Sequence, residues 1–289
     1  MMPRTTRTIR IALAGLALAA VLTGCTAQGA PAPSAPPETE ASPLDALEHV
    51  HEIAFRGETV LIASHQGVYS VVPADGQLEL VGDTAFDAMG MAATDAGTLA
   101  SGHPGAHTDE VFVGPNLGLI SSDGGGWESV ALSGEVDFHA LTAAADRSVI
   151  AGLPSGDTTV LTSVDLGQTW ERGATLEARD LVYVSGDLIA TTAEGPVRSE
   201  DRGMTFEPIE GAPLLVIVAA NPSGELVGVD ATGAIVHSGG AEWTTVGQAS
   251  GSAVAIAVDQ DGTIALVDDR GLVISSDGGA TWEPVALTM

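Results

Sequence analysis

A short motif, S-x-D-x-G-x-T-W, recurs along this chain and constrains its fold more than any other feature. Its aspartate, or Gly239 in the equivalent place, falls at positions 123, 165, 201, 239 and 277, so the spacings are 42, 36, 38 and 38 residues. A period of this length indicates one supersecondary unit per repeat. Three copies are nearly complete, at residues 163–170, 199–206 and 275–282, and two eroded copies begin at Ser121 and His237.

The residue types in the motif predict a hairpin turn rather than a catalytic site. The aspartate can accept hydrogen bonds from backbone N–H groups of its own turn. The glycine supplies a backbone angle that other residues resist, and the aromatic residue begins the next strand as a large apolar anchor. We therefore interpret the following residues as structural: Asp123, Asp165, Trp170, Asp201, Phe206, Asp277 and Trp282.

Each repeat also contains three further short strands. In the last repeat, apolar runs occupy residues 253–259, 263–267 and 272–276, and the motif leads into a fourth run at 281–287. The segment before the first motif has the same plan, starting at about residue 48. Four short strands per period of about forty residues are typical of a β-propeller blade. We predict an all-β propeller of six four-stranded blades, with seven as the rival count, whose two ends meet blade to blade.

The first 24 residues have the pattern of an export signal. Three arginines and no acid precede an apolar run from Ile11 to Val21, which is too short to cross a bilayer as a helix. The run ends in Leu-Thr-Gly-Cys25, which resembles the bacterial lipobox. This resemblance implies cleavage before Cys25 and a diacylglycerol on its thiol. We therefore expect an exported lipoprotein on the outer face of the cytoplasmic membrane, with residues 25–47 as a flexible tether and residues 48–289 as the propeller.

The charge of the chain excludes two classes of partner. It has 38 acidic residues, ten arginines and no lysine. Loss of residues 1–24 removes three arginines and no acid, which leaves a net charge of −31. Such a surface repels nucleic acid and anionic lipid. We expect a monomer that contacts the membrane through the lipid on Cys25 and binds a metal, a protein or a glycan.

Histidines gather on one predicted face of the first three blades. The first strand of each propeller blade lines the central channel, so its start and the end of the second strand share a face. Repeat alignment makes His51, Met89 and His139 equivalent positions. The other residues predicted on this face are His49, Asp87, Asp137, His65, His103 and His107.

Imidazole, carboxylate and thioether groups together suit a transition metal, and this mixture favours copper or zinc. The alternative interpretation is that these histidines are polar residues at a wet channel rim, and the sequence leaves both open. The predicted ligands are His49, His51, His65, His103 and His139, with Met89 and His107 as further candidates.

The repeated motif is the Asp-box, or BNR repeat, of sialidase-like propellers. The chain as a whole resembles actinobacterial lipoproteins labelled as BNR/Asp-box glycosyl hydrolases. The shared elements are the lipobox, His-x-His at 49–51, Ser-Gly-His-Pro at 101–104, Leu-Gly-Leu-Ile at 117–120 and Asp-Phe-His at 137–139. The resemblance implies the fold, and a hydrolase as the alternative function with Asp87 and Asp137 as candidate catalytic carboxylates.

The arginines argue against a sialidase, which holds its substrate carboxylate with three arginines. Arg172 and Arg202 lie in or beside motifs, and Arg56 and Arg147 fall in turns predicted on the opposite face from the histidines. Only Arg179 is predicted near a channel strand. We therefore favour an extracytoplasmic binding module over an enzyme.

Overall fold

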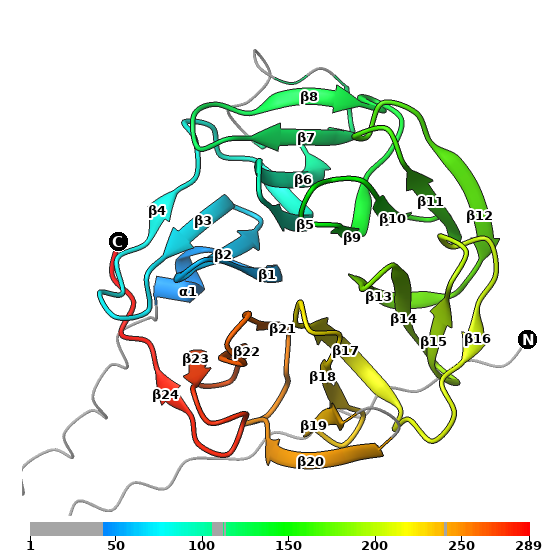
Figure 1. Ribbon diagram of the computed structural model, residues 1–289. Helices are drawn as coiled ribbons and strands as arrows, with labels where there is room; N and C mark the ends of the chain where they lie inside the picture. The colour runs from blue at the N-terminus through cyan, green and yellow to red at the C-terminus, as the bar shows by residue number, and fades with distance from the viewer. Residues whose placement is uncertain (1–42, 106–111, 113, 240–241) are drawn as a thin grey trace, which may run out of the picture. The chain divides into compact units, whose positions relative to one another are not determined.

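The computed structural model describes residues 43–289 except 106–111, 113 and 240–241. The chain divides into two compact units, Met1–Glu40 and Ala41–Met289, and the second contains all of the described residues. This unit consists of six four-stranded antiparallel sheets arranged as the blades of a propeller (Figure 1). The predicted fold class and the count of six blades are confirmed, and the rival count of seven is wrong. No described helix is long and apolar enough to cross a membrane.

The first three blades follow one another along the chain, and in each the strands are hydrogen-bonded in sequence order. Blade 1 contains β1 (Val50–Arg56), β2 (Thr59–Ser64), β3 (Gly67–Val71) and β4 (Glu79–Leu80). Blade 2 contains β5 (Asp87–Thr94), β6 (Gly97–His103), β7 (Leu119–Ser122) and β8 (Glu128–Ala131). Blade 3 contains β9 (Phe138–Ala143), β10 (Ile150–Pro154), β11 (Thr159–Ser163) and β12 (Glu171–Thr175).

The last three blades repeat this order, and the first strand of every blade lies closest to the centre (Figure 1). Blade 4 contains β13 (Ala178–Val184), β14 (Asp187–Thr192), β15 (Gly195–Ser199) and β16 (Glu207–Pro208). Blade 5 contains β17 (Leu215–Ala220), β18 (Leu226–Asp230), β19 (Ala234–Gly239) and β20 (Glu242–Gln248). Blade 6 contains β21 (Ala255–Val258), β22 (Ile264–Asp268), β23 (Gly271–Ser275) and β24 (Glu283–Pro284).

Burial follows from the stacking of the blades. In the second strand of every blade, at most one residue is not buried. These strands are buried along nearly their whole length because a neighbouring blade covers each face. The apolar core is accordingly divided into six clusters, each shared by two adjacent blades.

The ends of the propeller meet blade to blade, as predicted. Apolar residues of blades 1 and 6 form one cluster, and Thr288 donates a backbone hydrogen bond to Gly76 at 2.9 Å. A short helix, α1 (Pro43–Ala46), precedes blade 1, and Leu44 and Leu47 are buried in the same cluster. Residues 43–47, inside the segment predicted as the tether, therefore belong to the folded unit.

The three nearly complete motifs form the same turn between the third and fourth strands. The Ser163 hydroxyl donates to Asp165 Oδ1 at 2.8 Å, and Thr169 donates its backbone N–H to Oδ1 at 2.8 Å and its hydroxyl to Oδ2 at 2.6 Å. The same hydrogen bonds recur around Asp201 and Asp277. Gly167 has a φ of 87°, a conformation that glycine adopts without steric cost.

The eroded copy in blade 2 holds its tryptophan differently. Trp170 and Trp282 donate their indole N–H to the glycine carbonyl of their own turn, at 2.9 and 3.0 Å. Trp127 is buried and donates to the Val81 carbonyl of blade 1 at 2.9 Å. Loss of one residue from this motif thus coincides with a tryptophan that links two blades instead of closing a turn.

These turns predict a loss of stability in acid. Hydrogen bonds, first from the threonine hydroxyl and then from backbone N–H groups, lower the pKa of Asp165, Asp201 and Asp277 to about 2. A carboxyl with a lower pKa in the folded state stabilises the fold above its unfolded pKa, and this contribution disappears as the pH falls. We expect the free energy of unfolding to decrease from about pH 4 to about pH 2.

Urea unfolding between pH 2 and pH 5 measures this decrease. Changing all three aspartates to asparagine should flatten the pH dependence, because the titrating groups are removed. The control changes Asp95 and Asp261, exposed turn residues outside the motif, to asparagine. An equally steep dependence in the triple variant would contradict the prediction.

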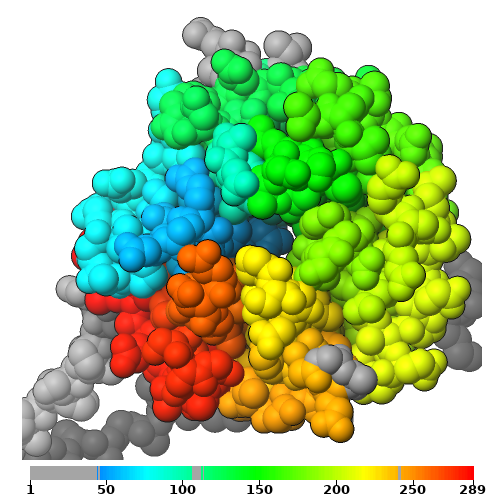
Figure 2. Space-filling view, viewed as in Figure 1, coloured from blue at the N-terminus to red at the C-terminus, as the bar shows by residue number. Residues whose placement is uncertain are grey.

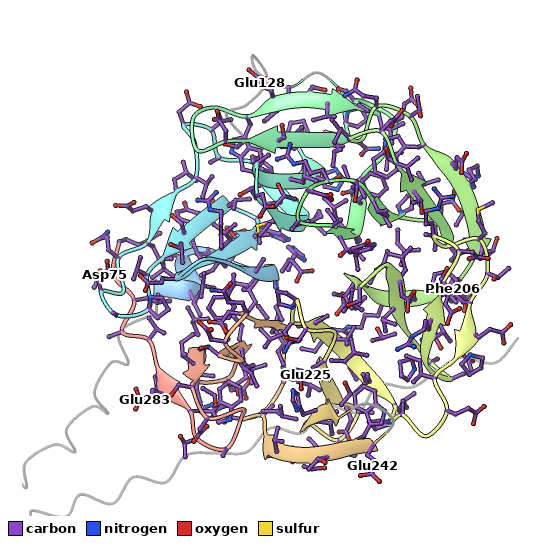
Figure 3. The ribbon with its side chains drawn as sticks, viewed as in Figure 1. Asp75, Glu128, Phe206, Glu225, Glu242 and Glu283 are labelled. Atoms are coloured by element: carbon purple, nitrogen blue, oxygen red, sulfur yellow. The ribbon has the colours of Figure 1, made fainter. Side chains whose placement is uncertain are left out.

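The acidic side chains are spread over the outside of the propeller. Asp75, Glu128, Glu242 and Glu283 are exposed at its rim (Figure 3).

Candidate functional site

A bulge near the start of each of the first five inner strands positions the residues at the channel mouth. The pairing between the first and second strands skips one residue at the same place in each of these blades, and a bulge of this kind redirects a side chain. The skipped residues are His51, Met89, His139, Arg179 and Val216. The predicted equivalence of His51, Met89 and His139 is therefore confirmed, and in blades 4 and 5 the same position holds no histidine.

The first group of ligand-type side chains lies between blades 2 and 3. His103 Nε2 is 3.1 Å and His139 Nε2 is 2.8 Å from the same oxygen, Asp137 Oδ2. Asp137 is only 3% exposed. Among the described residues, no well-aligned hydrogen bond reaches either of its carboxylate oxygens. Two imidazole nitrogens thus converge on a buried carboxylate.

The backbone sets the orientation of His103. Its Nδ1 lies 3.1 Å from the Pro115 carbonyl oxygen. Because a carbonyl only accepts, Nδ1 must carry a proton, and in the neutral ring Nε2 then presents a lone pair to Asp137. Asp137 also acts on His139: as acceptor for the protonated ring it raises the pKa of His139, although the N–H direction is not well aligned with the oxygen.

The second group lies between blades 1 and 2. One ligand atom from each of His51, His65 and Asp87 lies within 4.8 Å of the other two. His65 Nε2 is 3.8 Å from Asp87 Oδ1, and His65 Nδ1 is 3.7 Å from Glu48 Oε2. Burial, followed by the nearby His65, lowers the pKa of His51. His51 Nε2 and Asp87 Oδ1 are buried without a hydrogen-bond partner in the described part of the chain.

The structure thus brings four of the predicted ligands into two groups. Asp87 and Asp137, predicted on this face as carboxylates, are the third members. The ring of His49 meets the ring of His65 edge-on, with centroids 5.0 Å apart, but His49 belongs to neither group. Met89 is half-buried at its bulge. His107, like Cys25, lies outside the described residues.

The remaining histidine lies on another blade. His237 is in β19 of blade 5, where its Nε2 is 3.8 Å from Glu225 Oε2. Blades 4 to 6 therefore place no described histidine at the channel mouth, as predicted.

Two carboxylates that we did not predict narrow the channel. Glu52 and Asp180 follow the bulge residues of blades 1 and 4, and both line an 80 Å³ cavity at the mouth and a 180 Å³ cavity below it. Burial is the main cause that raises the pKa of both, and Asp180 adds to the effect on Glu52. Asp180 Oδ2 accepts the Val218 N–H at 2.8 Å. Glu52 and Asp180 occupy equivalent positions in their repeats, and this equivalence could have been found in the sequence. Closure of the ring is what places the two carboxylates opposite each other.

Three of the arginines lie where the sequence predicted. Arg56 and Arg147 donate to Thr98 and Thr94, at 3.2 and 2.9 Å, beside the first hairpin of blade 2 and away from the histidines. Among the described residues, Arg179 alone of the arginines lines the cavity at the channel mouth. A three-arginine carboxylate clamp is not assembled there.

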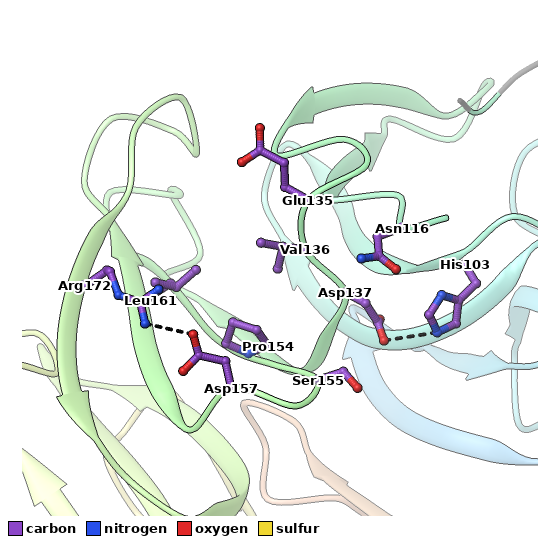
Figure 4. A pocket seen from close by; sticks show the side chains of 10 residues that line it. All are labelled: His103, Asn116, Glu135, Val136, Asp137, Pro154, Ser155, Asp157, Leu161 and Arg172. Carbon is purple, nitrogen blue, oxygen red and sulfur yellow. Dashed lines mark hydrogen bonds and ion pairs between the residues drawn. The ribbon is translucent and has the colours of Figure 1, made fainter. Parts of the chain in front are cut away.

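A pocket of about 370 Å³ adjoins the first group (Figure 4). His103 and Asp137 form one wall of this pocket, and Arg172 lies at the far side, where its Nη2 is 2.8 Å from Asp157 Oδ2. Asn116 and Glu135 also line it. The pocket therefore offers a polar space next to the buried carboxylate. Figure 2 shows the blades packed closely around a narrow central opening.

Comparison with known proteins shows the fold but no family. No protein-family model matches the chain, and no curated protein matches it significantly. A chain of a nidogen–laminin complex is similar in structure, with a TM-score of 0.57 and 12% identity over 75% of this chain and 89% of that one. The Xanthomonas campestris GH74 xyloglucanase has a TM-score of 0.53 and 17% identity, over 81% of this chain and 45% of the enzyme. An ancestral GH74 enzyme has a TM-score of 0.52 and 15% identity, over 81% and 38%.

This chain matches less than half the length of those GH74 enzymes. The neighbours include both a chain from a binding complex and hydrolases, so the fold is compatible with binding and with hydrolysis. At these identities the likeness concerns the fold alone.

Proposed function

We propose that this protein is a membrane-anchored extracytoplasmic propeller that binds a transition metal, zinc or copper, through His103, Asp137 and His139. The observation that carries the proposal is the convergence of two imidazole nitrogens on one oxygen of a buried carboxylate. Two histidines and one carboxylate are a frequent donor set for such metals.

The distances between the donor atoms fit an ion between them. In a tetrahedral zinc site with bonds of about 2.0–2.1 Å, donor atoms lie about 3.3 Å apart. The two nitrogens are 3.1 and 2.8 Å from the Asp137 oxygen, and one ligand atom from each of the three residues lies within 4.8 Å of the other two, so modest side-chain movements would admit the ion.

The electrostatics also favour a cation at this point. A cation at this point would be attracted by the negative Asp137 carboxylate and would accept the lone pair that a neutral imidazole offers from Nε2. Metal-binding histidines commonly donate their other N–H to a carbonyl or carboxylate, which fixes the ring. The contact of His103 with Pro115 is of this kind.

Three protein ligands leave a coordination position free for another molecule. His103 and Asp137 also line the 370 Å³ pocket, which supports a role in binding a further ligand there. The lipobox at Cys25 supports the membrane anchor, and the net charge supports the capture of cations from outside the cell. The hydrolase alternative is supported only by the likeness of the fold. Asp137 and Asp87, its candidate catalytic carboxylates, each lie among histidines, which favours metal binding.

Calorimetric titration of metal-free protein with Zn²⁺ and with Cu²⁺ tests the proposal. Asp137→Asn and His139→Ala should each weaken binding at this site by about 100-fold or more, because loss of a ligand costs at least as much as loss of the groups that orient it. His237→Ala, which removes a histidine of blade 5, is the matched control and should bind as the unchanged protein does. Absence of binding, or an equal loss in the control, would refute the proposal.

A further inference from the structure

The second histidine group directly adjoins the first. Asp87, in the second group, and His103, in the first, are cross-strand partners in the β5–β6 ladder. Directly paired residues in an antiparallel ladder have Cα atoms about 4.5–5.5 Å apart. His51 and His139, one from each group, line the same 80 Å³ cavity. The two groups therefore share a wall at the channel mouth.

From this arrangement we infer that His51, His65 and Asp87 form a second metal site, so that the face holds two divalent first-row ions side by side. The inference extends the proposed function from one ion to two. It rests on a second set of two imidazoles and a carboxylate, all within 4.8 Å of one another. In this set, one atom of His51 and one of Asp87 are buried and have no hydrogen-bond partner among the described residues.

The ring of His65 has a carboxylate on either side. Its Nε2 faces Asp87 at 3.8 Å, and its Nδ1 faces the Glu48 carboxylate at 3.7 Å. At 3.7 Å the Glu48 carboxylate is beyond hydrogen-bond distance, and a closer approach on metal binding would favour the proton on Nδ1 and leave Nε2 free for the metal. In the first group, the Pro115 carbonyl occupies the corresponding place behind His103.

The geometry also sets the order in which the sites fill. The His65–Asp87 distance of 3.8 Å exceeds the spacing of about 3.3 Å in a tetrahedral zinc site, so these side chains must draw together. In the first group the donors are already close and Asp137 is almost fully buried. An ion at the first site also repels a second cation at the adjoining site. The second site should therefore bind more weakly than the first.

Titration of metal-free protein with Zn²⁺ and elemental analysis of the loaded protein measure the number of ions. We expect two ions per chain, one ion after His65→Ala or Asp87→Asn, and one after His139→Ala. Asp87→Asn preserves the shape of the side chain, and circular dichroism verifies the fold of each variant. His237→Ala is the control and should retain two.

The outcomes separate this inference from the proposed function. One ion that survives His65→Ala and Asp87→Asn but is lost in His139→Ala overturns the second site and leaves the first. One ion lost in all three ligand variants means a single shared site, which also overturns the inference. With two equivalents of Cu²⁺, electron paramagnetic resonance should show dipolar broadening that His65→Ala abolishes, and two isolated signals would overturn the side-by-side arrangement.

Discussion

Phe138→Ala is expected to lower the free energy of unfolding by about 3–5 kcal/mol, the range for removing a fully buried phenylalanine. Phe138 is 0% exposed in the cluster between blades 2 and 3, and its ring centroid is 5.0 Å from that of Trp170. Its backbone N–H donates to the Ser101 hydroxyl of blade 2 at 2.9 Å. Denaturant unfolding measures the change.

The position of Phe138 predicts a second effect of the same substitution. It lies between Asp137 and His139 in the chain, so a cavity there loosens the strand that presents both side chains. We expect zinc affinity to fall together with stability. Leu266→Ala, in the core of blade 6, should cost about 2–5 kcal/mol and leave zinc affinity unchanged. Equal effects of the two variants on affinity would contradict a local role for Phe138.

Gly102→Ala is expected to lower the free energy of unfolding by about 4 kcal/mol, because it combines backbone strain with a steric collision. Gly102 has a φ of 150°, and a Cβ at this position would collide with the Asp87 carbonyl oxygen. The collision would separate β5 from β6 where Asp87 faces His103. Since each of these residues belongs to a different histidine group, zinc binding should weaken at both.

The matched control for Gly102 is Gly195→Ala. Gly195 has a φ of 128°, and nothing lies within 4 Å of an added Cβ. An alanine at this position therefore adds the strain of the backbone conformation, about 1–3 kcal/mol, without the collision. Gly195 also lies on blade 4, away from both histidine groups. Thermal unfolding and zinc titration of both variants separate the two contributions. If Gly195→Ala were as destabilising as Gly102→Ala, the collision would have no measurable role.

Much of this architecture was predictable because propeller blades are local structures. The serine, aspartate, glycine and threonine of each nearly complete motif form hydrogen bonds within one turn, so their spacing marks blades without knowledge of the rest of the fold. Repeats with the same backbone also place equivalent residues at equivalent points, which is why the amino-acid sequence suffices to align His51, Met89 and His139.

Other features depend on contacts between distant parts of the chain. Leu44 and Leu47 are buried only because blades 1 and 6 meet, and two leucines among alanines and prolines carry no periodicity that reveals this. Glu52 and Asp180, on blades 1 and 4, act on each other only because the ring closes. Neither effect is visible in a repeat considered alone.

By itself, the sequence determined the all-β class, the six blades, the turn that the nearly complete motifs form, and the gathering of histidines on blades 1 to 3. These follow from local hydrogen bonding and from a period that repeats along the chain. Only the tertiary structure decided how those histidines divide. Asp137 of blade 3 lies beside His103 of blade 2, and Asp87 of blade 2 lies beside His65 of blade 1. Side chains at the channel mouth reach across the boundary between two blades, and a repeat alignment, which compares blades one by one, does not show such contacts.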